Sequence, residues 1–152
     1  VYGFANVIIH KNPNLELSNE TSETPLNENQ YLLSVCPPYQ TEGYNTPATF
    51  NMAGTVYTNG FTLDCHGGTA LFNLNGQYSK LEFDLGYTDS SDRSDCNVNI
   101  YLDGQLEKNI VMTCEDLPQH IEISLEGASQ LKIENVNYGN MAVYGFANVI
   151  VY

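Results

Sequence analysis

The segments between the alternating apolar stretches of this sequence carry side chains that could bind a sugar. An aromatic ring stacks on the apolar face of a pyranose, while planar polar groups bond its hydroxyls in pairs. His66 also precedes two glycines, where backbone can approach a ligand closely. If such segments meet at one end of a folded sheet structure, they predict a small-ligand pocket. The candidate ligand-binding residues are Tyr39, Tyr44, Tyr57, Asn59, His66, Tyr87, Arg93 and Tyr138.

Each of these residues also has a plainer structural interpretation. A tyrosine in a β-protein is commonly a half-buried residue of a sheet surface. His66 could be a hydrogen-bonded structural histidine, and Arg93 could form an ion pair with the aspartates around it. The sequence leaves both interpretations open.

The acidic segment from residue 89 to residue 95 suggests a calcium site. Asp89, Asp92 and Asp95, together with backbone carbonyls, could supply oxygen ligands to a hard cation. The segment lacks the glycine and the distal glutamate of an EF-hand, so it is not that motif. The alternative is an ordinary solvated turn.

The four cysteines allow three disulfide pairings, and none of them stand in C-x-x-C spacing. The three histidines form no zinc pattern with them. Cys96 and Cys114 flank one predicted hairpin. With a two-residue turn Cys96 faces Val111, so a bridge to Cys114 needs a bulge or frayed strands. Buried free thiols are the alternative. The cysteines are Cys36, Cys65, Cys96 and Cys114.

Composition excludes several classes of function. The 152 residues hold 5 Lys+Arg against 18 Asp+Glu, a net charge of −13 that repels nucleic acids and anionic membranes. No apolar run is long enough to cross a bilayer. The chain has no G-x-S-x-G, H-E-x-x-H or P-loop motif, so catalysis has little support. With 11 Tyr, no Trp and 15% charged residues, the composition favours an extracellular β-protein.

Alternating apolar residues predict that strands position the candidate site. Asp103-Gly104 is a strong hairpin signal, and the only suggestion of a helical turn is at residues 115–117. Many short strands with frequent turns predict an all-β fold, a jelly-roll β-sandwich. The expected strands span residues 61–65, 81–85, 97–102, 106–113, 121–125, 131–133 and 143–150.

The chain also repeats itself. Val1–Ile8 is identical to Val143–Ile150, and the two copies start 142 residues apart. We therefore expect a tandem array, in which residues 1–10 are the last strand of a preceding module. Residues 11–29 form a polar linker, and residues 30–152 form the module. The first copy is expected to pair with a sheet edge, in this molecule or in a neighbour, and so to allow strand exchange.

Several segments in order resemble one family, from about Tyr31 to the end of the chain. Residues 54–61 are similar to its G-x-x-Y-x-x-G-hydrophobic segment, and residues 72–81 to its hydrophobic-x-L-x-G-x-Y stretch. Further matches lie at residues 31–34, 65–66, 85–89, 100–104 and 127–133. The family is the NPCBM group, the family-51-like carbohydrate-binding modules. The last strand departs from it, because Phe146 stands where the family usually has tryptophan.

The resemblance implies a galactose-binding-domain-like jelly roll with no catalytic role, in some relatives with a structural Ca²⁺. We expect a carbohydrate-binding module that is repeated in tandem on a secreted or cell-surface bacterial protein and binds a glycan. Single sites would be weak, and repetition would add avidity. The alternatives are a structural or adhesive stalk module that contacts proteins, and an appended domain of a glycosidase.

Overall fold

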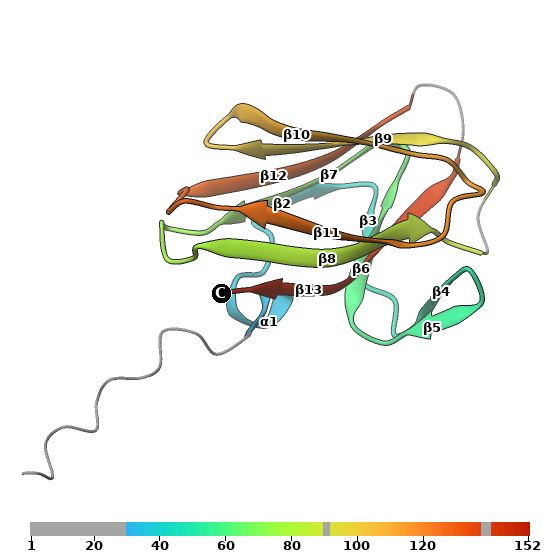
Figure 1. Cartoon of the computed structure of the whole chain (residues 1–152), viewed down its shortest axis with the longest axis horizontal. Helices are drawn as coiled ribbons and strands as arrows, with labels where there is room; N and C mark the ends of the chain where they lie inside the picture. Colours follow the sequence, from blue (N-terminus) through green and yellow to red (C-terminus); the bar gives the residue numbers. More distant parts are fainter. Residues whose placement is uncertain (1–29, 90–91, 138–140) are drawn as a thin grey trace, which may run out of the picture.

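The structure, a computed structural model, describes residues 30–89, 92–137 and 141–152, and this part of the chain folds into two stacked antiparallel sheets (Figure 1). The first sheet has the order β11 (Gln119–Ser124), β8 (Lys80–Tyr87), β13 (Val143–Val151), β6 (Gly60–Asp64) and β3 (Tyr44–Asn45), with β1 (Gln30–Tyr31) also paired to β13. The second sheet has the order β10 (Gln105–Met112), β9 (Cys96–Leu102), β12 (Gln130–Val136), β7 (His66–Asn73) and β2 (Gln40–Glu42). The predicted all-β sandwich is confirmed.

The core lies between the two sheets and follows the alternation seen in the sequence. In β8, Leu81, Phe83 and Leu85 are fully buried while the residues between them face outward. Phe146 of the central strand β13 stacks on Phe61, with ring centroids 4.9 Å apart and planes 8° from parallel. Phenylalanine therefore fills the core at the position where the family usually has tryptophan.

The Asp103-Gly104 hairpin forms as predicted, and its register determines which residue lies opposite Cys96. Both turn residues have positive φ, 47° and 81°. A bulge after Leu106 then shifts the pairing by one residue, so that Cys96 faces Met112. The predicted partner, Val111, was wrong for this reason.

The cysteines of this structure are free thiols. The bulge does not bring Cys96 opposite Cys114, and no disulfide joins them. The thiol of Cys65 instead shares a hydrogen bond with the thiol of Cys96, and this contact, together with burial, raises the pKa of Cys65 strongly.

Residues 31–34 match the opening strand of the family, but in the structure they are mostly not a strand. Only β1 extends, and α1 (Leu32–Val35) follows as one helical turn. The Cys36 amide donates to the Leu32 carbonyl at 2.7 Å. The turn places Leu32, which is fully buried, under the end of the core. Burial of this side chain therefore prevails over the strand pattern.

The strand connections gather at the two ends of the sandwich. At the right-hand end of Figure 1 lie the ends of β8, β10 and β12, the starts of β9, β11 and β13, and the separate hairpin of β4 (Phe50–Met52) and β5 (Thr55–Tyr57). The C-terminus and α1 lie at the other end. The described residues contain no helix long and apolar enough to span a membrane. The first copy of the repeat, the linker and Tyr138 lie outside the described residues.

Candidate functional site

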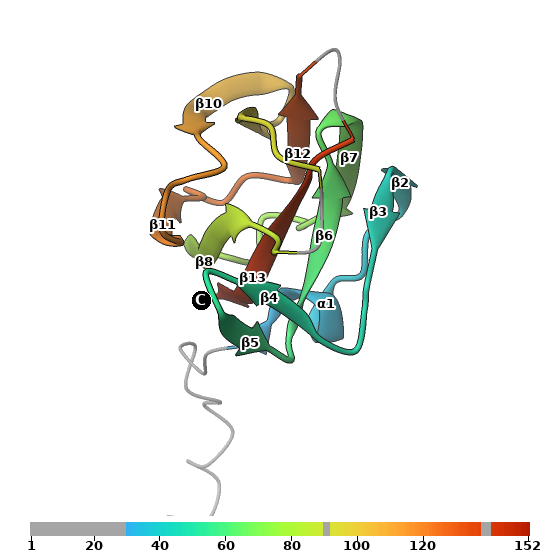
Figure 2. The same ribbon diagram turned by 90° about the vertical axis from the view of Figure 1, so that its right-hand side faces the viewer.

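A cavity of about 600 Å³ is lined by residues of three connecting segments. These segments lie at the right-hand end of the sandwich in Figure 1, the end that faces the viewer in Figure 2. The walls of the cavity come from the β4–β5 hairpin, the β8–β9 connection and the β10–β11 connection. Three carboxyl groups and one guanidinium line it beside small and apolar groups. The lining residues are Ala53, Tyr87, Asp89, Arg93, Cys114, Glu115, Asp116 and Leu117.

Hydrogen bonds to carboxylates fix the walls of this cavity. The Gly54 amide at the tip of the β4–β5 hairpin donates to Asp89 Oδ2 at 2.8 Å, which ties the hairpin to the end of β8. The Thr113 amide donates to Asp116 Oδ2 at 2.7 Å, which closes the turn after β10. Both carboxylates keep a second oxygen that can accept from a ligand.

Arg93 supplies the positive charge of the cavity. Its Nη2 atom lies 3.2 Å from Glu115 Oε1, with 62% and 81% of the two side chains exposed. The plainer interpretation expected an ion pair with the neighbouring aspartates, whereas the ion pair in the structure is with Glu115 of the β10–β11 connection. Such an exposed pair contributes little to stability, so its donors and acceptors can turn toward a ligand at small cost.

Tyr87 lines the cavity and packs on a second tyrosine, Tyr144, which is buried behind it. Tyr87 is only 8% exposed and packs edge-on against the ring of Tyr144, with centroids 5.9 Å apart. Little of the Tyr87 ring is therefore open to a ligand. The buried Tyr144 hydroxyl donates toward the carbonyls of Ser94 (3.0 Å) and Met112 (3.4 Å), so one side chain links the two connections that flank the cavity. Burial raises the pKa of Tyr144 strongly.

A second hollow of about 430 Å³ lies at the same end and is lined in part by Thr62, Thr88 and Met141. Asp92 lines it as well, away from Asp89 in the larger cavity. Met141 is 71% exposed. The end of the sandwich therefore offers a polar cavity and, separately, a hollow with apolar side chains at its rim.

Three predicted tyrosines lie elsewhere in the described structure. Tyr39, 53% exposed, lines a hollow of about 330 Å³ that also has Tyr101 and Lys132 in its wall. Tyr44 packs on Phe61, with centroids 5.2 Å apart, at the edge of the core. Tyr57 stacks on a phenylalanine of the neighbouring strand β4, at 5.9 Å. None of the three is among the residues that line the 600 Å³ cavity.

Asn59 and His66 also lie outside that cavity, and the contacts seen at these positions are those of the sheet backbone. The Asn59 carbonyl accepts from the Asn148 amide at 2.9 Å. His66 is exposed at the start of β7. A Cβ atom at Gly68 would lie 2.4 Å from the Asp64 carbonyl oxygen, so this glycine allows β6 and β7 to approach closely. The glycines after His66 therefore serve the β6–β7 turn.

Two aspartates of the suggested calcium site, Asp89 and Asp95, have separate partners, and Asp92 lines the second hollow. Asp89 accepts from Gly54, and the Cys114 amide donates to Asp95 Oδ1 at 3.1 Å. Within residues 30–89, 92–137 and 141–152, the metal-ligating side chains that converge are on another face of the protein. Calcium binding by the aspartates therefore stays a prediction.

From the predicted set, the structure brings together Tyr87, Asp89 and Arg93 in one cavity. Reasoning from sequence missed the opposite wall, Glu115, Asp116 and Leu117, although it marked the same residues as a turn. Acidic residues in a turn are common, so only the folded position distinguishes these from an ordinary solvated turn.

The sequence matches the family model described as NPCBM/NEW2 domain over residues 16–148. A comparison with curated proteins found no match. The fold is similar to CBM51 from Clostridium perfringens GH95, solved in complex with methyl-galactose, with a TM-score of 0.67 and 17% identity over 82% of this chain and 100% of that one.

Two further solved structures have similar folds. One is the M60 catalytic domain with CBM51-1 and CBM51-2 from Clostridium perfringens ZmpB, with a TM-score of 0.66 and 16% identity over 82% of this chain. The present chain spans 15% of that protein. The other is the tandem CBM51 modules of Sp3GH98 from Streptococcus pneumoniae, with a TM-score of 0.57 and 7% identity over 68% of this chain and 35% of that one.

Proposed function

Because this chain belongs to the NPCBM/NEW2 domain family, we propose that it is a non-catalytic carbohydrate-binding module whose glycan occupies the 600 Å³ cavity at the end of the sandwich. We assign the glycan site to this cavity because one guanidinium and three carboxylates, held by hydrogen-bonded turns, line it together. These groups can donate to and accept from neighbouring sugar hydroxyls. The solved neighbour that holds methyl-galactose supports a sugar as the ligand.

The charge of the site narrows the class of glycan. Asp89, Glu115 and Asp116 surround the single arginine, and the whole chain carries a net charge of −13. Sialylated, sulfated and uronic acid sugars would be repelled. A neutral oligosaccharide is the ligand that fits, with Arg93 donating to ring or hydroxyl oxygens.

A glycan array probed with the full chain tests this function, and affinity gels measure the effect of Arg93→Ala. We expect binding to neutral glycans, weakened about tenfold or more when the guanidinium is removed, because hydrogen bonds from charged groups contribute about 1.5–3 kcal/mol. The arginine makes only an exposed ion pair, so the variant should keep its melting temperature.

Lys108→Ala is the matched control, since Lys108 is an exposed cation on β10 outside the cavity. It should bind like the unmodified chain. Equal binding by Arg93→Ala would move the glycan site away from this cavity. Failure to bind any glycan would favour the alternative, a stalk module that contacts proteins.

The repeated strand supports a tandem array on a secreted or cell-surface bacterial protein. Val143–Ile150 lies within β13, between β8 and β6 at the centre of its sheet, and the first copy of the same residues suits the same slot in a neighbouring molecule. Tandem CBM51 modules in the streptococcal neighbour provide a parallel. Linked weak sites would add avidity.

Deleting residues 1–10 is expected to lower the mass of the particle in solution, because strand exchange through the first copy would be lost. Light scattering of the full chain and of the deletion variant over a range of concentrations measures this. The same mass for both would exclude exchange between molecules and leave pairing within one molecule.

A further inference from the structure

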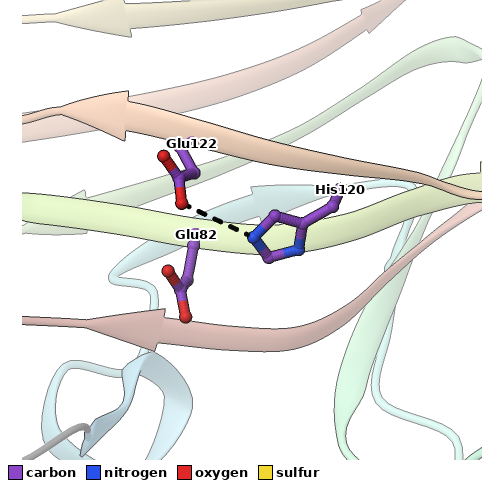
Figure 3. A group of neighbouring side chains, drawn as sticks. All are labelled: Glu82, His120 and Glu122. Atoms are coloured by element: carbon purple, nitrogen blue, oxygen red, sulfur yellow. Dashed lines mark ion pairs between the residues drawn. The ribbon is translucent and has the colours of Figure 1, made fainter.

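We infer that Glu82, His120 and Glu122 form a binding site for a divalent transition-metal cation on the outer face of the first sheet, on β8 and β11 (Figure 3). One atom from each side chain, a histidine nitrogen and two carboxylate oxygens, lies within 4.8 Å of the others. The site is separate from the cavity proposed for glycans and does not depend on that proposal.

The register of the sheet creates the cluster. Glu122 stands directly opposite Glu82, and His120 opposite Asp84, with the alternate residues Phe83 and Ile121 buried in the core. The four polar side chains therefore share the outer face. Like charges directly opposite each other destabilise an antiparallel pair, and a cation between the two glutamates relieves this repulsion.

The histidine is oriented for a metal. Its Nδ1 atom lies 2.9 Å from Asp84 Oδ1, and its Nε2 atom lies 3.9 Å from Glu122 Oε1. A carboxylate that accepts a hydrogen bond from one ring N–H fixes the tautomer and leaves the lone pair of the other ring nitrogen available to a metal. The Asn148 amide group holds the second oxygen of Asp84 at 3.0 Å, which keeps this carboxylate in place.

The ligands need only a small movement to bind a metal. Zinc lies about 2.1 Å from nitrogen and oxygen ligands, so tetrahedral ligands are roughly 3.4 Å apart. The atoms of the cluster must therefore approach by about 1 Å. His120 and Glu122 can move, since 54% and 62% of their side chains are exposed.

Glu82 is held more firmly than the other two ligands, and the Lys80 ammonium group that holds it would compete with a metal. Glu82 accepts from the Tyr152 hydroxyl, and its Oε2 atom lies 3.0 Å from Lys80 Nζ. A metal at Glu82 must displace this ammonium group, which can remain over the ring of Tyr152, 3.9 Å from its centroid. Removal of the Lys80 charge should therefore strengthen metal binding.

The ligand set favours zinc over calcium. Imidazole nitrogen suits zinc and similar metals, while calcium takes 6–8 oxygen ligands. Zinc is thus the probe for this site. A titration with calcium would test the separate prediction that the three aspartates bind this ion.

Titration calorimetry of the chelator-treated full chain with zinc chloride, at about pH 8 so that protons compete less with the metal for the histidine, tests the site. We expect saturable binding that weakens at least tenfold in His120→Ala and in Glu122→Gln, and tightens in Lys80→Ala. Each of the first two substitutions removes a direct metal ligand at an exposed position. Unchanged melting temperatures would show that these variants fold.

His66→Ala is the matched control, because it removes an exposed histidine from the other sheet. It should bind zinc like the unmodified chain. Absence of saturable zinc binding would overturn the inference. Equal binding by the two histidine variants would also overturn it and would assign the metal to other groups, such as the thiols.

Discussion

Phe146→Ala is expected to lower the free energy of unfolding by about 3–5 kcal/mol. The ring is fully buried at the centre of β13, stacked on Phe61 at 4.9 Å and tilted against Phe83 at 5.6 Å. Truncation would remove both ring contacts and leave a cavity that β-strands on either side cannot easily close. Since domains are stable by only about 5–15 kcal/mol, the variant would lose a large share of its stability.

Urea unfolding followed by circular dichroism measures this loss, because the chain has no tryptophan to report by fluorescence. Phe146→Leu keeps most of the volume and should cost less than half as much. Val111→Ala is the control, since Val111 is 64% exposed on β10 and such changes usually stay within about 0.5 kcal/mol. A loss below about 1 kcal/mol for Phe146→Ala would contradict the central place of this ring in the core.

The regular part of the fold could be predicted because it depends on local pattern. The alternating segments around Phe83, Ile100 and Ile123 are the cores of β8, β9 and β11, and Asp103-Gly104 fixed one hairpin. In these segments one face is buried, so period-two alternation is strong. The same alternation predicted the position of β13, whose residues are repeated at the start of the chain.

The parts that sequence did not predict depend on distant partners. β7 begins with His66 and two glycines, which indicate a turn, yet β12 and β2 pair with it on either side. The β4–β5 hairpin has strands of three residues each, too short for a periodic signal. Leu32 lies in an apolar stretch typical of a strand, and its burial under the core makes it helical instead.

The candidate site shows the same limit. Tyr87, Asp89 and Arg93 share a cavity because they are close in sequence, at the end of β8 and in the connection that follows it. The other candidates belong to separate segments, and which segments converge is decided by the order of strands in the sheets. Glu82 and His120 are brought together only by the register of β8 with β11. Alternation predicts that each faces outward, but it does not predict that they are neighbours.

The G-x-x-Y-x-x-G segment that suggested both the family and a tyrosine for the ligand is explained by the fold. Gly54 turns the β4–β5 hairpin with φ of 76°, and Tyr57 stacks on Phe50 across it. Gly60 starts β6 with φ of 143°, against the backbone of β13. The three residues that define the segment therefore each have a structural role, and that of Gly60 is the most restrictive.

Gly60→Ala is accordingly expected to destabilise the protein by roughly 3 kcal/mol or more, or to prevent folding. An added Cβ atom would lie 2.0 Å from the Phe146 carbonyl oxygen and 2.9 Å from the Ala147 Cα. Both are backbone atoms of the central strand, so no side-chain rotation relieves the overlap, and β6 must separate from β13. The positive φ adds strain for any residue with a Cβ.

Gly54→Ala separates the two causes, because its φ is also positive but no atom lies within 4 Å of the added Cβ. It should cost only the conformational strain, about 1–2 kcal/mol. Urea unfolding of both variants gives the comparison, and the yield of soluble protein replaces it where Gly60→Ala does not fold. Equal losses would mean that strain alone explains Gly60, and that β6 and β13 tolerate a wider separation than their hydrogen-bonded register implies.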